Sequence, residues 1–207
     1  MNIEKLQFPE NPNVFFSWLK KLSEKVWENI EPREGIFGFQ TQKETKWIEG
    51  LSEEEIEEYE SELGFLFPEI YKTYLRNMNG TDKPAINFYG NGESIAYAPN
   101  YYSFPRDLEI VKDRVQWIYK EFLVDEEEVQ RENIPHIIPI VSHRFLIADN
   151  CAKNPILSMH GRDSILYAPS LESFLVADIF RNHSIVTTDS EFQIKLWLDE
   201  DLEYLNA

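Results

Sequence analysis

The sequence predicts an α+β fold in which helices pack on a mixed, mostly antiparallel sheet. Apolar residues recur at helical spacing through most of the first 80 positions and again at 108–122 and 171–179, whereas short β-branched runs lie between 137 and 167. Helices and strands that occur in separate blocks, rather than in alternation, are typical of this fold class. The chain has 207 residues, 43% of them hydrophobic and 14% aromatic, so it can build a core without disulfides.

The N-terminal segment predicts a loop followed by one amphipathic helix. Residues 9–13 are rich in proline and asparagine, which favours the loop. Apolar residues then recur at spacings of one, three or four, which places them on one helical face. They are Trp18, Leu19, Leu22, Val26 and Ile30. Pro32 and Gly35 end this pattern, and residues 36–40 favour a short strand.

The clearest local pattern, at residues 51–80, predicts two short helices joined by a tight corner. Ser52 and Glu55 have the spacing of a capping box, in which each side chain binds a free amide of the first turn. Gly64 is suited to end the first helix, and Pro68 to begin the second. The apolar stripes of the two helices comprise Ile56, Tyr59 and Leu63, and Ile70, Tyr71, Tyr74, Leu75 and Met78.

We expect residues 65–67 to be buried at the corner between these helices and Asn79-Gly80 to end the second one. After residue 84 the spacing of apolar residues changes toward every second position, which is the period of a strand. Residues 85–89 and 94–98 predict a β-hairpin around Gly90-Asn91-Gly92. The remaining expected elements are a helix at 108–122, strands at 137–141, 145–148, 156–159 and 164–167, a helix at 171–179 capped by Ser170, a strand at 184–187 and a final helix at 192–205.

The charge balance limits the classes of partner. The chain has 20 Lys and Arg against 37 Asp and Glu, a net charge of −17. Such a surface repels phosphate backbones and anionic lipid, so nucleic-acid and membrane binding are not expected, and it favours basic partners. One cysteine, no secretory pattern at the N-terminus and no run of eighteen apolar residues favour the cytoplasm.

Two features are candidates for a partner surface. Seven glutamates lie between positions 53 and 62, and Glu54, Glu57 and Glu58 would form an outward stripe on the first helix of the pair. The alternative is an ordinary solvated face. The aromatic loop at 97–104 contains Tyr101 and Tyr102, which suit a binding surface. The alternative is that their rings anchor the loop onto the core.

Catalytic and metal-binding motifs are weak. The histidines are His136, His143, His160 and His183, and none forms a close pair with another or with Cys151 that is typical of a metal site. There is no phosphate-binding glycine loop and no Gly-x-Ser-x-Gly motif. We therefore expect no catalytic residue, no metal and no cofactor. An enzyme that uses His143, Cys151 and His160 is a remote alternative.

The stretch from Trp47 to Gly80 resembles the opening of the SUKH superfamily, whose best-known branch is the Smi/Knr family of cell-wall assembly regulators. The matching positions are Leu51, Ser52, Ile56, Glu60, Leu63, Gly64, Phe67, Pro68, Tyr71, Tyr74, Leu75, Asn79 and Gly80. The segment Ile137-Ile-Pro-Ile-Val, the strand that ends at Ala148-Asp149 and the helix at 171–179 are similar to the later part of the family pattern. The resemblance covers about residues 47–180.

This resemblance implies a single SUKH-like α+β domain at 47–183, with an N-terminal helical extension at 1–46 and a C-terminal extension at 184–207 that packs on the same domain. It implies structural roles for the family motif. Gly64, Pro68 and Gly80 would shape turns, Leu63 and Tyr71 would fill the core, and Asn79 is a further position of the structural motif. It brings no catalytic residue.

The resemblance also implies the class of function, since many bacterial members are immunity proteins that neutralise polymorphic toxins, often nucleases. The leading hypothesis is therefore a non-catalytic immunity protein that binds a basic toxin domain. The alternative is an intracellular scaffold or regulator of the Smi/Knr type. We predict that the partner surface comprises Glu54, Glu57, Glu58, Tyr101 and Tyr102.

Overall fold

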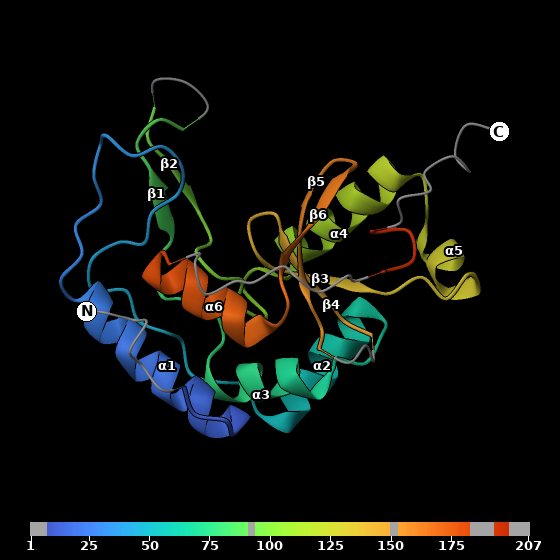
Figure 1. Ribbon diagram of the computed structural model, residues 1–207, viewed down its shortest axis with the longest axis horizontal. Helices are drawn as coiled ribbons and strands as arrows, with labels where there is room; N and C mark the ends of the chain where they lie inside the picture. The colour runs from blue at the N-terminus through green and yellow to red at the C-terminus, as the bar shows by residue number, and fades with distance from the viewer. Residues whose placement is uncertain (1–7, 91–93, 150–152, 183–192, 199–207) are drawn as a thin grey trace. The chain divides into compact units, whose positions relative to one another are not determined.

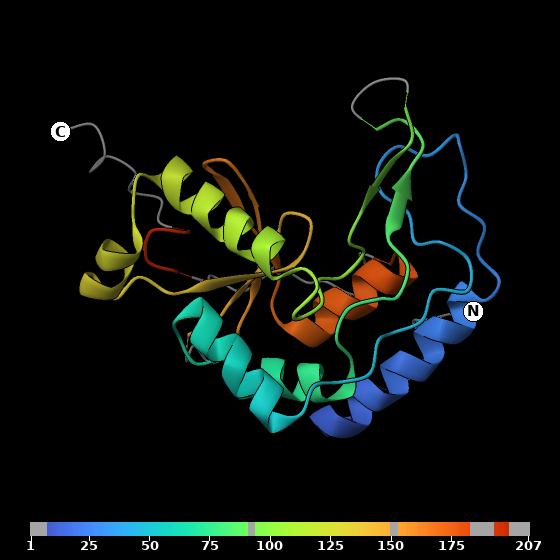
Figure 2. The same ribbon diagram turned by 180° about the vertical axis from the view of Figure 1, so that it is seen from behind.

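The computed structural model describes residues 8–90, 94–149, 153–182 and 193–198, and these confirm the α+β class. The described helices are α1 (Pro12–Trp27), α2 (Glu53–Leu63), α3 (Glu69–Asn77), α4 (Leu108–Phe122), α5 (Glu126–Arg131) and α6 (Leu171–Phe180). The described strands are β1 (Ala85–Asn87), β2 (Ala96–Ala98), β3 (Ile137–Val141), β4 (Arg144–Ile147), β5 (Ile156–His160) and β6 (Asp163–Ala168). Figures 1 and 2 show them from opposite sides.

The chain divides into two compact units. Unit 1 comprises residues 1–111 with 140–142, and unit 2 comprises residues 112–139 with 143–207. Unit 1 therefore contains α1, α2, α3 and the two-stranded sheet β1-β2. The four-stranded sheet has the order β3-β4-β5-β6, and α5 and α6 belong to unit 2. The N-terminal helix is thus part of the same unit as the α2–α3 pair.

Helix α1 begins earlier than the sequence predicts and buries a different face. The Asn11 side chain accepts a hydrogen bond from the Val14 amide, and Pro12 occupies the first turn, so residues 12 and 13 are helical rather than loop. The buried residues are Phe15, Phe16, Leu19, Ser23 and Trp27. Of the predicted stripe only Leu19 is fully buried, and the pattern missed the rest of the buried face because Ser23, a polar residue, lies in the middle of it.

The buried Ser23 hydroxyl both donates and accepts a hydrogen bond. It donates to the Leu19 carbonyl at 2.7 Å and accepts a hydrogen bond from the Trp47 indole at 2.7 Å. Helix α1 lies along α3 in both Figures 1 and 2. There the Phe16 and Tyr74 rings meet edge to face, 5.8 Å between centroids, and the Lys20 ammonium donates to the Asn77 carbonyl. The N-terminal segment therefore packs directly against the α2–α3 pair.

The corner between α2 and α3 is only partly buried. Gly64 ends α2 in the left-handed conformation, with φ +81°, as predicted. Phe67 is buried, but Leu66 is 77% exposed, so the expectation that all of residues 65–67 are buried was wrong. Three consecutive side chains on an extended corner cannot all point to one side, which accounts for the difference. Pro68 occupies the N-cap position of α3 without a capping hydrogen bond from its side chain, and the helix begins one residue later.

The end of α3 holds the aromatic loop in place. The Asn79 side chain donates to the Phe104 carbonyl at 2.6 Å and accepts from the Phe104 amide at 2.9 Å. Gly80 follows with φ +68°, and a Cβ atom there would lie 2.7 Å from the Tyr101 carbonyl oxygen and 2.6 Å from the Ser103 Cβ. We call this arrangement of Asn79, Gly80 and the backbone of residues 101–104 the Asn-Gly clamp.

The two strands of the predicted hairpin are present, but β1 and β2 are shorter than the expected 85–89 and 94–98, and Asn91 and Gly92 of the expected turn lie outside the described residues. The strands are antiparallel, with Ala85 opposite Ala98 and Asn87 opposite Ala96. The expected strand at 36–40 is reduced to one bridge between Gln40 and Ile86. The buried Gln40 side chain instead donates to the Arg33 carbonyl and accepts from the Arg33 amide, which holds the preceding loop beside the hairpin.

In unit 2, strands β5 and β6 lie side by side in both views, and α6 packs on β6. The ends of β5 and β6 pair through His160 and Asp163. The unit's core contains Phe122, Phe145 and Leu157, together with Ile194 and Trp197 from the C-terminal segment. The Trp197 indole donates to the Pro135 carbonyl.

Two further expectations differ from the structure. The acidic residues after α4 form part of the short helix α5, capped by Asp125, which was not expected. Residues 193–198, within the helix expected at 192–205, form no helix but an irregular segment with a turn at 195–197. Residue 192 and residues 199–205 of the expected helix lie outside the described residues, as does the strand expected at 184–187. The proposed domain boundaries at 46 and 183 remain a prediction.

We predict that Gly80→Ala destabilises the protein by about 3 kcal/mol, because the new methyl group combines left-handed strain with collision against fixed backbone. Gly64→Ala is the matched control. Its φ is also positive, but nothing lies within 4 Å of the added Cβ, so it should cost about 1 kcal/mol. Urea unfolding of both variants measures the difference. Equal losses would show that the close approach at Gly80 contributes nothing.

Candidate functional site

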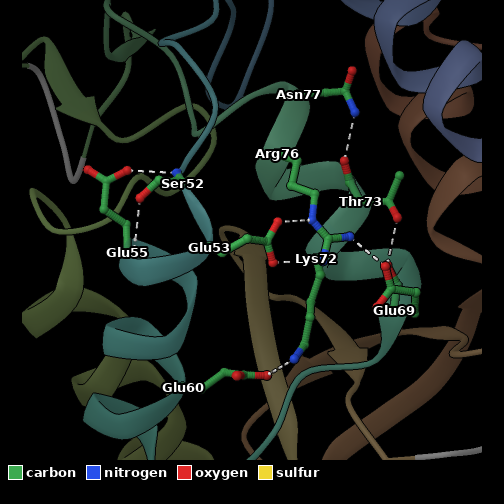
Figure 3. Close-up of polar contacts among 9 residues, drawn as sticks. All are labelled: Ser52, Glu53, Glu55, Glu60, Glu69, Lys72, Thr73, Arg76 and Asn77. Carbon is green, nitrogen blue, oxygen red and sulfur yellow. Dashed lines mark hydrogen bonds and ion pairs between the residues drawn. The ribbon is translucent and has the colours of Figure 1, made fainter.

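The α2–α3 pair presents the acidic surface that the sequence singles out. Both arms of the predicted capping box are formed, since the Ser52 hydroxyl accepts from the Glu55 amide and the Glu55 carboxylate accepts from the Ser52 amide. This fixes the first turn of α2. The apolar side chains Ile56 and Tyr59 are buried, which leaves the opposite side of the helix to its glutamates. Figure 3 shows the polar contacts of this region.

Four of the seven glutamates, Glu53, Glu55, Glu60 and Glu62, take part in interactions, and the partners of the first three lie in the α2–α3 region. Glu55 completes the capping box. Glu53 receives two hydrogen bonds from the Arg76 guanidinium, which also binds Glu69, so Arg76 connects α2 to α3 (Figure 3). Hydrogen bonding to Arg76 lowers the pKa of Glu53, which keeps this carboxylate ionised. Glu60 is the third.

Glu60 is the buried member of the group, with 6% of the residue exposed. Its carboxylate accepts from the Phe67 amide at 2.6 Å and pairs with the Lys72 ammonium at 2.6 Å. It therefore satisfies a buried amide of the corner and connects α2 to α3 a second time (Figure 3). Glu60 is one of the positions that carry the resemblance described above, and the structure shows what it binds there.

Glu54, Glu57 and Glu58 are different. All three are exposed, and within the described part of the chain they make no hydrogen bond or ion pair. Spacings of three and four residues place them on one face of α2, where like charges repel by about 0.2–0.5 kcal/mol per pair. We call these three residues the glutamate stripe. Its charges are thus available to a cationic partner.

Tyr101 and Tyr102 do not lie on the surface. They are 1% and 8% exposed, respectively. The Tyr101 ring packs on Trp47 with 4.8 Å between centroids, and the Tyr102 amide donates to the Ile140 carbonyl. The expectation that their rings contribute to a partner surface is corrected accordingly. They anchor the loop onto the core, which was the alternative interpretation. Of the predicted partner surface, the glutamate stripe alone remains exposed.

The aromatic motif residues Phe67, Tyr71 and Tyr74 belong to an aromatic core in unit 1 that also contains Tyr59 and Phe104. Tyr71 stacks on Tyr74 and meets Phe67 edge to face, while Tyr59 stacks on Phe104. Burial raises the pKa of Tyr59, Tyr71 and Tyr74, so these phenols stay neutral. Leu63, in contrast, is only partly buried. The motif positions Ser52, Glu60, Gly64, Asn79 and Gly80 thus have specific roles in capping, in the corner and in the clamp.

Of the three residues in the remote enzyme hypothesis, His143 and His160 lie close together. The His143 and His160 rings meet edge to face, 6.3 Å between centroids, and Trp117 contacts His160. Cys151 lies outside the described residues. Partial burial, together with the nearby Arg144, His160 and Arg114, lowers the pKa of His143 to about 4. Within the described residues, no three His, Cys, Asp or Glu side chains form a group that could hold a metal ion.

Comparison with protein families matches residues 50–177 to the SMI1 / KNR4 family (SUKH-1). The chain belongs to this family. The match covers more than half of the chain and contains α2, α3 and the Asn-Gly clamp. A search of curated proteins found no match. Family membership supports a non-catalytic SUKH-type module, and proteins with this domain commonly bind protein partners. No helix among the described residues is long and apolar enough to cross a membrane.

We predict that Glu60→Ala destabilises the protein by about 2–4 kcal/mol, because it leaves the Phe67 amide and the Lys72 ammonium without their partner. Glu60→Gln keeps an acceptor for the amide and should lose less. Glu57→Ala is the control on the same helix and should change stability by less than about 0.5 kcal/mol. Thermal and urea unfolding test the order. A loss at Glu57 as large as that at Glu60 would contradict it.

The lowered pKa of His143 predicts a pH dependence. Between about 4 and 6.5 the unfolded chain binds a proton at this site that the folded protein does not, so stability should rise with pH across this window. The stability that is linked to the lowered pKa of His143 is fully present above pH 6.5 and is lost as the pH falls toward 4. His143→Gln should flatten this part of the profile, measured as the urea midpoint against pH. Parallel profiles for the two proteins would exclude the effect.

Proposed function

We propose that this protein is a non-catalytic immunity protein that binds and neutralises a basic toxin domain, such as that of a nuclease. The observation that carries the proposal is the glutamate stripe, whose carboxylates are exposed, unpaired within the described residues and held on a helix fixed at both ends. Membership of the SMI1 / KNR4 family (SUKH-1) supports a protein-binding module. We expect it to act in the cytoplasm.

The electrostatics favour such a partner in two ways. First, a net charge of −17 creates a negative field that attracts a basic domain from a distance and raises the association rate, by about 10–1,000-fold at low salt. Second, a cationic partner relieves the repulsion among Glu54, Glu57 and Glu58. Because nuclease sites are themselves cationic so as to hold phosphates, an acidic inhibitor can occupy the position of the substrate.

Rigidity adds to this argument. The capping box fixes the first turn of α2, the Glu53–Arg76 pair connects it to α3, and the Glu60–Lys72 pair does so near the other end. The stripe therefore lies on a helix whose position on α3 is determined before binding. Little conformational entropy is lost when a partner contacts a surface that is already ordered.

We predict that the triple variant Glu54→Lys, Glu57→Lys, Glu58→Lys binds the cognate toxin about 10–100-fold more weakly and with a flatter salt dependence. Thermal stability should change little, because none of the three carboxylates has a described partner. The toxin encoded by the neighbouring gene is the binding partner to test, with titration at low and high salt and growth rescue on co-expression.

A matched control separates the stripe from net charge. Reversal of Glu10, Glu34 and Glu49, which are exposed and unpaired among the described residues, also changes the net charge from −17 to −11, since each replacement adds two charges. It should weaken binding far less. Equal effects would show that the stripe is not the contact. Failure of the unaltered protein to relieve toxicity would contradict the immunity function and favour a scaffold.

A further inference from the structure

Two arginines of unit 2 are held against aromatic rings rather than against carboxylates. The Arg114 guanidinium lies over Trp117, 6.0 Å from the ring centroid, and that of Arg144 lies over Tyr167 at 3.8 Å. Within the described residues neither arginine forms an ion pair with Asp or Glu, although the chain contains 37 of these acids. Stacking fixes the plane of a guanidinium and leaves the N–H donors along its edge available to an acceptor.

Two histidines join these arginines at one end of the strands β4, β5 and β6. His143 directly precedes β4 and His160 ends β5, and the Met159 amide donates to the His143 carbonyl at 2.9 Å. The rings of the two histidines meet edge to face, 6.3 Å between centroids, and Trp117 meets His160 at 5.6 Å. We call the following four residues the arginine–histidine cluster: Arg114, His143, Arg144 and His160.

The pKa of His143 reports a positive local potential in the cluster. Partial burial, followed by the nearby Arg144, His160 and Arg114, lowers this pKa to about 4. These three neighbours are all cationic groups. At physiological ionic strength the Debye length is about 8 Å, so the distant acids that give the chain its net charge are largely screened here. An anion at the cluster is therefore attracted by it, despite the net charge of −17.

Two carboxylates border the cluster on the side of the β5–β6 turn. Asp163 lies opposite His160 in the register of these strands, and the Glu121 carboxylate lies 3.6 Å from the position of a Cβ atom added at Gly161. This turn lies beside α4 in both Figures 1 and 2, and the Arg162 side chain donates to the Glu121 carbonyl. Neither carboxylate pairs with the two stacked arginines, so that side of the cluster is left to an external anion.

We propose that the arginine–histidine cluster is the contact surface for a short acidic segment of a partner protein, separate from the contact of a basic partner with the glutamate stripe. A guanidinium presents parallel N–H donors that match the two oxygens of a carboxylate. Arg, Trp and Tyr are also the residue types that contribute most to binding at protein interfaces. Nucleic acids and anionic membranes extend beyond one cluster and would meet the acidic remainder of the chain, which favours a short segment as the occupant.

Titration of the whole protein with a short polyglutamate peptide, at about 0.15 M salt, tests the proposal. The nuclear magnetic resonance signals of the His143 and His160 imidazoles and of the Trp117 indole should shift. The internal control is His136, whose ring pairs with Asp149 at 3.0 Å and should not respond. We expect a dissociation constant on the order of 1 mM. A neutral Gly-Ser peptide of the same length should not bind. Absence of shifts well above that peptide concentration, or equal shifts at His136, would overturn the proposal.

Point variants locate the surface. Arg114→Gln should weaken binding of the peptide about threefold to tenfold, and Arg114→Lys, which keeps the charge but loses the planar donors, should fall between. Glu121→Gln removes a neighbouring negative charge and should strengthen binding about twofold. The matched control is Lys153→Gln, which makes the same change in net charge as Arg114→Gln. Lys153 is exposed between the end of β4 and the start of β5, at the opposite end of these strands. An equal loss in this control would show that net charge, rather than the cluster, is responsible.

Two further measurements separate the proposal from its alternatives. A short single-stranded oligonucleotide and vesicles of anionic lipid are titrated in the same way, and binding of either one without binding of the peptide would overturn the proposal. The triple variant Glu54→Lys, Glu57→Lys, Glu58→Lys should bind the peptide at least as tightly as the unaltered protein, because the cluster is intact. Loss of peptide binding in this variant would also overturn it. None of these titrations contains a toxin, so their outcome is independent of the immunity function.

Discussion

The Asn-Gly clamp is the constraint on which unit 1 depends. The Asn79 side-chain amide donates to the Phe104 carbonyl and accepts from the Phe104 amide, 25 positions away in the chain. Only a short side chain with a donor and an acceptor can do this, and only glycine at position 80 permits the carbonyls of residues 101 and 102 to approach so closely. A local turn at the end of α3 therefore determines where a distant loop lies.

This clamp explains why the tyrosines of the loop belong to the core. Once Phe104 is held against α3, its ring stacks on Tyr59 of α2, and Tyr101 meets Trp47. The loop then covers the aromatic side chains that the helices present. Tyrosine is common at interfaces because its ring is large and stiff, and the same properties suit it to a core built mainly of rings. Residue type alone could not decide between the two roles.

Local chemistry made the helices and turns predictable. The capping box at Ser52, the left-handed glycine at 64 and the short apolar runs of β4 to β6 depend on neighbours in the sequence, and the structure has them close to where the pattern places them. The errors arose where distant groups decide the outcome. Ser23 is buried because Trp47 donates to it, and Glu60 is buried because Lys72 and the Phe67 amide bind it. No pattern of apolar spacing contains that information.

The glutamates of α2 show how far the candidate site could be predicted. Helical spacing correctly separated Glu54, Glu57 and Glu58 from the buried face, since exposure follows from the position of Ile56 and Tyr59. Helical spacing did not separate the glutamates that bind other side chains of the protein from those that do not, because the partners Arg76 and Lys72 come from α3. That division matters for function. A carboxylate that already binds a cation offers little to a partner, whereas three unpaired carboxylates on one face repel one another until an external cation arrives.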